Sequence, residues 1–298
     1  MAANTRDIRR RIKSVKNTAQ ITKAMQMVAA SKMRKAQQAA IASRPYAREL
    51  SRLLLPFANL VNEDEALAHP LLATKRDGKD LVLLVSTDKG LCGALNTNVL
   101  REVSRFNPET TEFVCVGKKG VQFLARAKRQ VLADFHLKDS FSFFDAQAVA
   151  MFCMERFMQG DIARVVVLYT HYVNTLTQSP AEQVVVPVKS FNVGHVELGH
   201  DNEKSDSAVT LDVPEYLLEP NGKDFLASLL PHFVSYKIFH LILEARASEH
   251  SARMVAMKNA TDNAKQLIKD LTLEYNKIRQ ASITTEILEI ATAQMILS

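Results

Sequence analysis

The segment of this sequence best suited to chemistry is STDKGLCGALN, residues 86–96, which carries glycines between an expected strand and an expected helix. Backbone amides at such a turn can bind phosphate. The segment matches neither the GxGxxG pattern of dinucleotide-binding proteins nor the GxxxxGK[ST] pattern of phosphate-binding loops. We therefore favour a tight structural turn over nucleotide binding, and we expect Gly90 and Gly93 to adopt backbone conformations open to glycine.

Side chains that could hold a metal or form disulfides are sparse. Cys92, Cys115 and Cys153 include no CxxC pair and are odd in number, which favours reduced thiols in a cytosolic compartment. His195 and His200 lie in a polar, acidic segment that we interpret as a solvated loop rather than a metal site. No Ser–His–Asp, Cys–His or paired-carboxylate pattern suggests a common site. We expect no cofactor and no catalysis by this chain alone.

Positive charge is concentrated at the N-terminal end. Residues 1–52 contain thirteen Lys and Arg against two acids, a net of +11, whereas the remainder carries 25 basic and 30 acidic side chains. Such a block attracts an acidic partner: nucleic acid, an anionic membrane surface or an acidic protein loop. Residues 1–44 contain no aromatic side chain. This argues against single-stranded nucleic acid, whose bases stack on aromatic rings, but leaves duplex binding open.

A further group of polar side chains lies in YNKIRQASITTEILEI, residues 275–290, within an expected helix. From the pattern alone we interpret this group as an exposed face. Its members are Arg279, Gln280, Thr284, Glu286 and Glu289.

Glycine and proline indicate which elements carry these segments. All nine glycines and all nine prolines lie between Pro45 and Pro231, so residues that break helices are missing from both ends. We predict an N-terminal helix within residues 1–56 and a C-terminal helix within 222–298. Because most helical stability comes from packing one face, we expect these two long helices to form a coiled coil.

The apolar spacing supports a coiled-coil seam, although unevenly. Small residues dominate parts of it, including EARASEHSARMVAM at 244–257. On the first helix the seam residues are Ile8, Ile12, Val15 and Ala19, after which the seam is expected to shift to Ile21, Met25 and Val28. On the second helix they are Ala260, Ala264, Leu267, Leu271, Tyr275 and Ile278.

The middle of the chain, residues 78–192, is typical of an α/β domain. Short apolar runs predict strands at 80–86, 112–117, 163–173 and 182–190, and Pro187 makes the last an edge candidate. Helical patterns lie between them at 95–106, 118–128 and 144–158. This alternation predicts a small doubly wound sheet. Residues 193–221 are polar and are expected to form a connecting loop.

Three of these segments resemble the gamma subunits of F-type ATP synthases, in their bacterial form. They are residues 4–37, 86–96 and 252–290, which occur in the same order as in that family. The resemblance implies an α/β fold in which the terminal helices form a long antiparallel coiled coil beside the central domain. It also implies a rotor shaft without catalytic residues, which couples proton-driven ring rotation to ATP synthesis or hydrolysis at the β subunits.

The resemblance further implies partners and a location. One copy would join a hexamer of α and β subunits, an epsilon subunit and the ring of c subunits, peripheral to the cytoplasmic face of the inner membrane. A basic coiled-coil protein that binds nucleic acid is the main alternative, and a nucleotide-binding enzyme is the third. A nucleic-acid-binding protein would show steeply salt-dependent duplex binding. A nucleotide-binding enzyme would show saturable ATP binding by the isolated chain.

The resemblance also assigns roles to particular residues. An acidic loop of the β subunits would meet Lys23, Lys32 and Arg34, with Met25 packing beside them. Polar contacts with a β loop would involve Arg279, Gln280, Thr284 and Glu286, while Arg253 and Glu289 fall at further coupling positions. The family's signature loop would include Asp88, Gly90, Cys92 and Gly93, and Tyr216 and Glu219 would lie in the region facing the c ring. The tail departs from the family, with Ala293 and Gln294 where Gly-Ala is usual.

Overall fold

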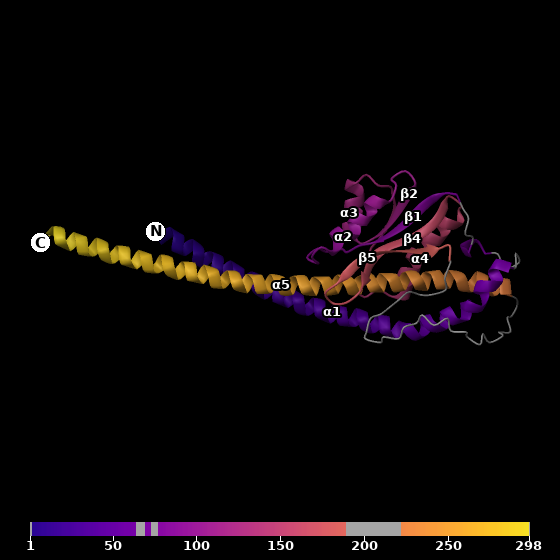
Figure 1. Cartoon of the computed structure of the whole chain (residues 1–298), viewed down its shortest axis with the longest axis horizontal. Helices are drawn as coiled ribbons and strands as arrows, with labels where there is room; N and C mark the ends of the chain where they lie inside the picture. Colours follow the sequence, from indigo (N-terminus) through magenta and orange to yellow (C-terminus); the bar gives the residue numbers. More distant parts are fainter. Residues whose placement is uncertain (1, 64–68, 73–76, 189–221, 298) are drawn as a thin grey trace. The chain divides into compact units, whose positions relative to one another are not determined.

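A computed structural model describes residues 2–63, 69–72, 77–188 and 222–297 of the chain (Figure 1). Two long helices, α1 (Ala2–Glu63) and α5 (Gly222–Leu297), flank a five-stranded sheet in the sequence. The chain divides into two compact units. Met1–Ala30 and Arg253–Ser298 form the first, called here the helical unit, and Ser31–Ala252 form the second, called here the sheet unit.

Both long helices continue through prolines. Helix α1 passes Pro45 and Pro56 and ends at Glu63. Helix α5, which begins at Gly222, contains Pro231 near its start. Each proline removes one backbone hydrogen bond from a helix. In α1, packing offsets this loss, because Leu50 and Leu54 between the two prolines are buried in the main core of the sheet unit.

The sheet has the order β3-β2-β1-β4-β5. Its strands are β1 (Lys79–Val85), β2 (Thr111–Val116), β3 (Val131–Phe135), β4 (Ile162–Tyr172) and β5 (Gln178–Val186). The first four are parallel to their neighbours, and β5 pairs antiparallel with β4 at one edge. The four predicted strands and the edge position of the last are confirmed. Strand β3 was missed. The sheet is mixed rather than wholly parallel because β5 runs antiparallel to β4.

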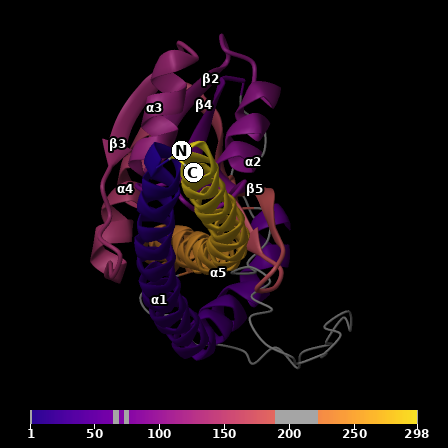
Figure 2. The same cartoon turned by 90° about the vertical axis from the view of Figure 1, so that its left-hand side faces the viewer.

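Helices cover both faces of the sheet, as expected for a doubly wound arrangement. They are α2 (Leu95–Glu102), α3 (Lys118–Arg126) and α4 (Phe143–Met158), and two short 3-10 turns lie at Pro70–Leu72 and Val103–Arg105. Alternate residues of β1 enter different cores: Leu81 and Leu83 join the core beneath α4 and α5, whereas Val82 and Leu84 join the core beneath α2 and α3. Figure 2 shows these layers from the end of the long helices.

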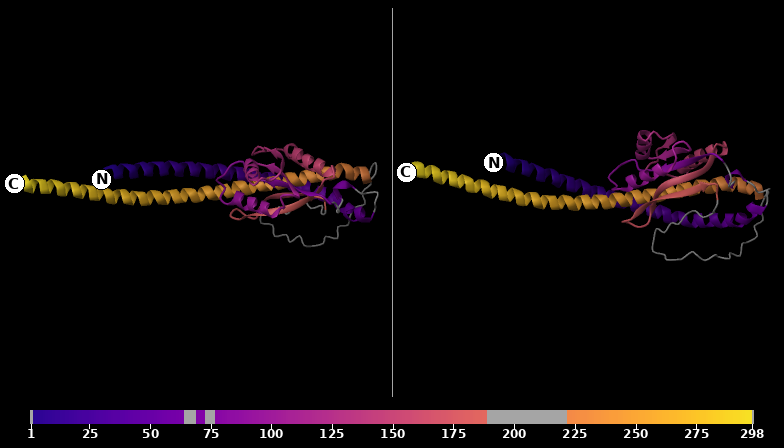
Figure 3. Two further views of the ribbon diagram at one scale, coloured as in Figure 1. Left: turned by 90° about the horizontal axis from the view of Figure 1, so that it is seen from above. Right: turned by 45° about the horizontal axis from the view of Figure 1, so that its top comes forward.

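In the helical unit, α1 and α5 run antiparallel (Figure 3). Their seam keeps its regular spacing through Thr22, whose hydroxyl lies 2.8 Å from that of Thr261. The predicted shift is wrong for Ile21 and Val28, which are 60% and 55% exposed, whereas Met25 is half-buried. Leu267, predicted in the seam of the second helix, is also exposed. The sequence pattern favoured apolar residues, whereas a threonine pair joined by a hydrogen bond occupies the seam here. Buried seam residues are Ile8, Ala29, Met257, Ala264 and Leu271.

In the sheet unit, α5 is a core helix. Nearly every residue from Phe233 to Ala252 is buried, including several that carry charge. The prediction that residues 244–257 form a small-residue coiled-coil seam is therefore wrong for 244–252, which belong to the sheet unit. One 18-residue window of α5 is apolar enough to cross a membrane, but 67% of it is buried within the chain.

Candidate functional site

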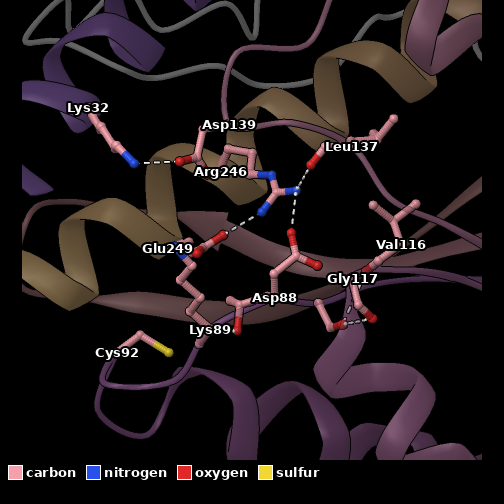
Figure 4. Close-up of polar contacts among 12 residues, drawn as sticks. Lys32, Asp88, Lys89, Cys92, Val116, Gly117, Leu137, Asp139, Arg246 and Glu249 are labelled. Atoms are coloured by element: carbon pink, nitrogen blue, oxygen red, sulfur yellow. Dashed lines mark hydrogen bonds and ion pairs between the residues drawn. The ribbon is translucent and has the colours of Figure 1, made fainter.

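The loop at residues 86–94 lies against α5 through a buried charged cluster (Figure 4). At its centre Arg246 of α5 is only 3% exposed. Its Nη1 donates to Oε2 of Glu249 at 2.9 Å, and its Nη2 donates to the carbonyl oxygen of Leu137 at 3.0 Å. The same Nη2 lies 3.7 Å from Oδ2 of Asp88. One guanidinium therefore joins α5, the loop after β1 and the segment between β3 and α4.

Asp88 extends the cluster to the start of α3. Its Oδ1 accepts a hydrogen bond from the backbone N–H of Lys118 at 3.1 Å. Nearby, the N–H of Gly120 donates to the hydroxyl of Ser86 at 2.8 Å. Two backbone amides at the start of α3 are thus engaged by side chains of the loop after β1.

Lys32 of α1 joins the cluster from the other side. Its ammonium donates to the carboxylate of Asp139, which follows Leu137 in the same segment. The hydrogen bond from Lys32 lowers the pKa of the Asp139 carboxyl below its usual value, and the charges of Lys32, His250 and Arg246 act in the same direction. Both side chains remain about half exposed, so this pair is a partly screened extension of a buried centre.

Two glycines near the loop have conformations that favour glycine. Gly93 has φ +61, as predicted, and Gly117 at the end of β2 has φ +97. A Cβ at Gly117 would lie 2.3 Å from the carbonyl oxygen of Ser86, which no real side chain tolerates. Gly90 was expected to need such freedom and does not; instead Leu91 takes the left-handed conformation with φ 62.

The cysteine of the loop packs against residues of two helices. Cys92 is buried with Leu95 of α2 and Ala252 of α5. Its Sγ accepts a hydrogen bond from Nδ2 of Asn96 at 3.4 Å. Burial raises the thiol pKa of Cys115 and of Cys153 to about 12 in each case. All three cysteines are buried thiols and none forms a disulfide.

The residues expected to contact partners are spread along the two long helices. Lys32 alone among them enters the charged cluster, while Met25 and Arg253 are half-buried. Exposed side chains belong to Lys23, Arg34, Arg279, Gln280, Thr284, Glu286 and Glu289. Tyr216, Glu219, His195 and His200 lie outside the described residues.

Arg246, Glu249 and Asp139 form much of the cluster but were not predicted from the sequence. A signal existed in the run LILEARASEHS, where charged residues interrupt an otherwise apolar stretch without glycine or proline. Charged side chains are almost never fully buried unless they are paired. A paired, desolvated cluster of this kind holds its elements in one arrangement, so its natural effect is to fix the loop and the sheet on α5.

Comparison with known proteins gives a consistent result across the whole chain. A family profile described as ATP synthase matches residues 4–295. The ATP synthase gamma chain of Methylacidiphilum infernorum is 48% identical over 300 residues, covering 98% of each chain. The ATP synthase gamma chain of Opitutus terrae is 45% identical over 292 residues, with the same coverage.

Solved structures share the fold. A chain of the Euglena gracilis mitochondrial ATP synthase assembly OSCP/F1/c-ring superposes with a TM-score of 0.66 at 20% identity, covering 100% of this chain and 95% of that one. A chain of the Tetrahymena thermophila mitochondrial ATP synthase central stalk/c-ring gives a TM-score of 0.58 at 23% identity. That match covers 80% of this chain and 99% of the other.

Proposed function

This chain belongs to the ATP synthase gamma chains, and from that premise we propose how it works as the central rotor shaft of an F-type ATP synthase. The shaft couples proton-driven ring rotation to ATP synthesis or hydrolysis at the β subunits, and this chain supplies no catalytic residue. The observation that carries the proposal is the family match over residues 4–295.

The helical unit is the part that turns inside the hexamer of α and β subunits. It is asymmetric, because α1 and α5 differ in sequence and in length. Each orientation therefore has a different contact energy with the open and closed conformations of the three β subunits. Rotation shifts the population of each β subunit among these conformations in turn, which is the only way a partner can drive such a change.

The basic face of α1 would meet an acidic loop of the β subunits. Lys23 and Arg34 have exposed side chains that can approach such a loop. Met25 is half-buried at the seam and can pack beside it. Lys32 is half exposed, and it would hold Asp139 in the segment before α4 while still offering charge to the partner.

The C-terminal part of α5 would provide a second set of contacts with the hexamer. Exposed polar groups for a β loop are those of Arg279, Gln280, Thr284 and Glu286, with Arg253 and Glu289 at further coupling positions. The last described turns also expose Ile283, Ile287 and Ile290. Exposed apolar side chains along an otherwise solvated helix mark contacts with other proteins, which supports placing this segment inside the hexamer.

The five-stranded sheet, with helices α2, α3 and α4, would lie outside the hexamer, against the epsilon subunit and the c ring. Tyr216 and Glu219 are the residues we assign to the ring-facing region. One copy of the chain per complex would sit peripherally at the cytoplasmic face of the inner membrane. The cluster around Arg246 would then transmit force, because it joins the sheet, which the c ring would turn, to α5, which would turn inside the hexamer.

Reconstitution tests the assignment. The chain is mixed with α and β subunits from the same source, and native mass and steady-state ATPase are measured. We expect one copy to enter a three-plus-three assembly that sustains ATP hydrolysis. Failure to assemble with folded partners would overturn the shaft assignment. Salt-dependent binding of duplex DNA by the purified chain would then favour the nucleic-acid alternative.

A further inference from the structure

Strand β4 extends beyond the strand beside it. Its pairing with β1 ends at Leu168, whereas its pairing with β5 continues to Tyr172. In the described sheet, residues 169–172 therefore have a strand on one side only. Thr170 and Tyr172 are both buried. Because buried backbone N–H and C=O groups need partners, the side of β4 that lacks a strand must be bonded in another way.

Side chains of α5 bond the backbone on that side. Thr170 lies opposite Pro180 of β5, which has no N–H, so the residue opposite offers its carbonyl oxygen no donor. The hydroxyl of Ser248 donates to this carbonyl oxygen at 3.0 Å. Tyr172 lies two residues further, where the backbone groups point the same way. Its N–H donates to Oε1 of Glu244 at 3.1 Å.

A third side chain of α5 continues the series. The hydroxyl of Ser251 donates to the carbonyl oxygen of Thr175 at 2.9 Å, in the turn between β4 and β5. Glu244, Ser248 and Ser251 follow one another at intervals of four and three residues, so they lie on one face of α5. We call these three side chains the Glu244 row. Both serines are fully buried and Glu244 is 4% exposed, so water competes little for these bonds.

Glu244 is the charged member of the row, and β4 surrounds it with polar groups. Besides the N–H of Tyr172, its carboxylate contacts Nδ1 of His171. Burial, the charge of Glu244 and a hydrogen bond to Glu244 raise the pKa of the Tyr169 hydroxyl. This hydroxyl therefore keeps its proton and remains a donor. An ionised carboxylate only accepts hydrogen bonds and has room for about four, which fits three partners on one strand.

The Glu244 row is separate from the charged cluster around Arg246. Residues two apart on a helix do not face each other, so Glu244 and Arg246 leave α5 on different sides. Arg246 holds the segments that follow β1 and β3, through Asp88 and Leu137. Glu244 holds the end of β4. Loss of the Glu244 carboxylate would therefore release the end of β4 from α5 and leave the bonds of Arg246 in place.

We propose that Glu244 is a positioning residue for rotary coupling, whose carboxylate holds the carboxyl end of β4 on α5 so that torque passes between the sheet and the helix at this point. The inference rests on the proposed function, since torque passes through the chain only if it is the shaft. Glu244 acts through the backbone of β4. A shaft without this bond slips under load before it unfolds.

Proton pumping by the complete synthase in sealed lipid vesicles tests this role. ATP hydrolysis and ATP-driven proton uptake are measured on the same vesicles, and the ratio of uptake to hydrolysis is the readout. Glu244→Met removes the acceptor, and it should lower this ratio by roughly twofold or more while hydrolysis continues. Glu244→Gln keeps an amide oxygen at the same reach for the N–H of Tyr172, and its ratio should stay near the parental value.

Val99→Ala is the control for a general loss of stability. Val99 of α2 is buried in the core on the other face of the sheet, so its truncation should destabilise the chain and leave the ratio unchanged. Hydrogen exchange reports the local effect. Because hydrogen bonds to charged groups are the stronger ones, amides of residues 169–176 should exchange about tenfold faster in Glu244→Met than in the parent or in Val99→Ala.

The outcomes separate the two proposals. A parental ratio in Glu244→Met, or an equal fall in Glu244→Gln or Val99→Ala, would overturn the positioning role and leave the shaft role intact. Should Glu244→Met fail to assemble, the double variant Ser248→Ala and Ser251→Ala decides. It removes only the neutral bonds of the row, its ratio should also fall, and an unchanged ratio would overturn the proposal. Failure of the unsubstituted chain to assemble would instead overturn the shaft role, and this inference with it.

Discussion

The guanidinium of Arg246 lies 3.7 Å from the carboxylate of Asp88, which joins the middle of α5 to the loop that follows β1. The two residues are far apart in the sequence, yet Asp88 also accepts a hydrogen bond from the first residue of α3. The contact therefore links a helix that reaches the C-terminus to two loops at the carboxyl ends of parallel strands. A shaft that carries torque needs its segments to be firmly joined, and this contact joins α5 to the sheet.

Replacing Arg246 by methionine should strongly destabilise the chain. The substitution leaves Glu249 and Asp88 without their buried partner, and removing one member of a buried pair typically costs about 3–5 kcal/mol. Urea denaturation of the full chain, followed by far-ultraviolet circular dichroism, measures the effect. Arg101→Met on the exposed surface of α2 is the control and should change stability by less than about 0.5 kcal/mol. Equal stability of the two variants would show that the cluster does not hold the sheet unit together.

Gly117→Ala should be destabilising, whereas Gly90→Ala should not. Gly117 has φ +97, and an added Cβ would meet the backbone of Ser86. We expect a loss of at least about 1–3 kcal/mol from backbone strain alone. A Cβ at Gly90 would meet nothing within 4 Å, so this glycine of the loop after β1 is the matched control. Thermal unfolding of both variants compares them directly, and a tolerant Gly117 would contradict the backbone geometry described above.

Lys237 should make stability depend on pH in the alkaline range. It is 4% exposed, and burial lowers the pKa of its ammonium from 10.5 to about 8. Between these two values the unfolded chain holds a proton that the native chain has released, so the free energy of unfolding rises with pH. Below pH 8 the native ammonium is buried in its charged form, and the full unfavourable effect applies.

Lys237→Met should therefore stabilise the protein at pH 7, by up to about 3 kcal/mol. Its advantage should shrink as the pH rises from 8 to 10.5. Urea denaturation of both proteins at several pH values gives the difference, and Lys118→Met on the exposed surface serves as the control. A difference that stays constant across this window would show that Lys237 is not desolvated in the native chain.

Truncation after Gln280 should leave assembly intact and reduce ATP hydrolysis. It removes Thr284, Glu286 and Glu289, but keeps the buried seam residues of the helical unit. A loss of about tenfold in the ATPase rate of the reconstituted complex corresponds to about 1.4 kcal/mol in activation free energy. Removal of residues 295–298 alone is the control. Unchanged activity in a normal complex would keep the shaft and discard the C-terminal contact residues.

Much of the fold could be predicted from the sequence, because continuous apolar runs signal strands buried on both faces. Strand β3 was missed because its five residues, VLADF, are only partly buried and include an acid. Helix α1 was expected to end near Pro56, but it continues to Glu63.

The candidate site was harder to predict. The glycine-bearing loop at 86–96 was found, and Gly93 behaves as expected. Its main partner, Arg246, was hidden in a helix interpreted as a coiled-coil seam. A buried charge is recognisable only when its partners are known, and Asp88, Leu137 and Glu249 come from three separate parts of the chain. The shift of the seam to Ile21 failed for a related reason, since a threonine pair across the helices cannot be read from one helix alone.

The most direct test of the shaft role is to watch this chain turn. All three native cysteines are buried, so a cysteine introduced at the exposed Lys128 can be labelled selectively on the reconstituted complex. With the hexamer fixed to a surface and ATP supplied, the account predicts sustained rotation of the label in one direction. Sustained ATP hydrolysis with the label stationary relative to the hexamer would contradict it.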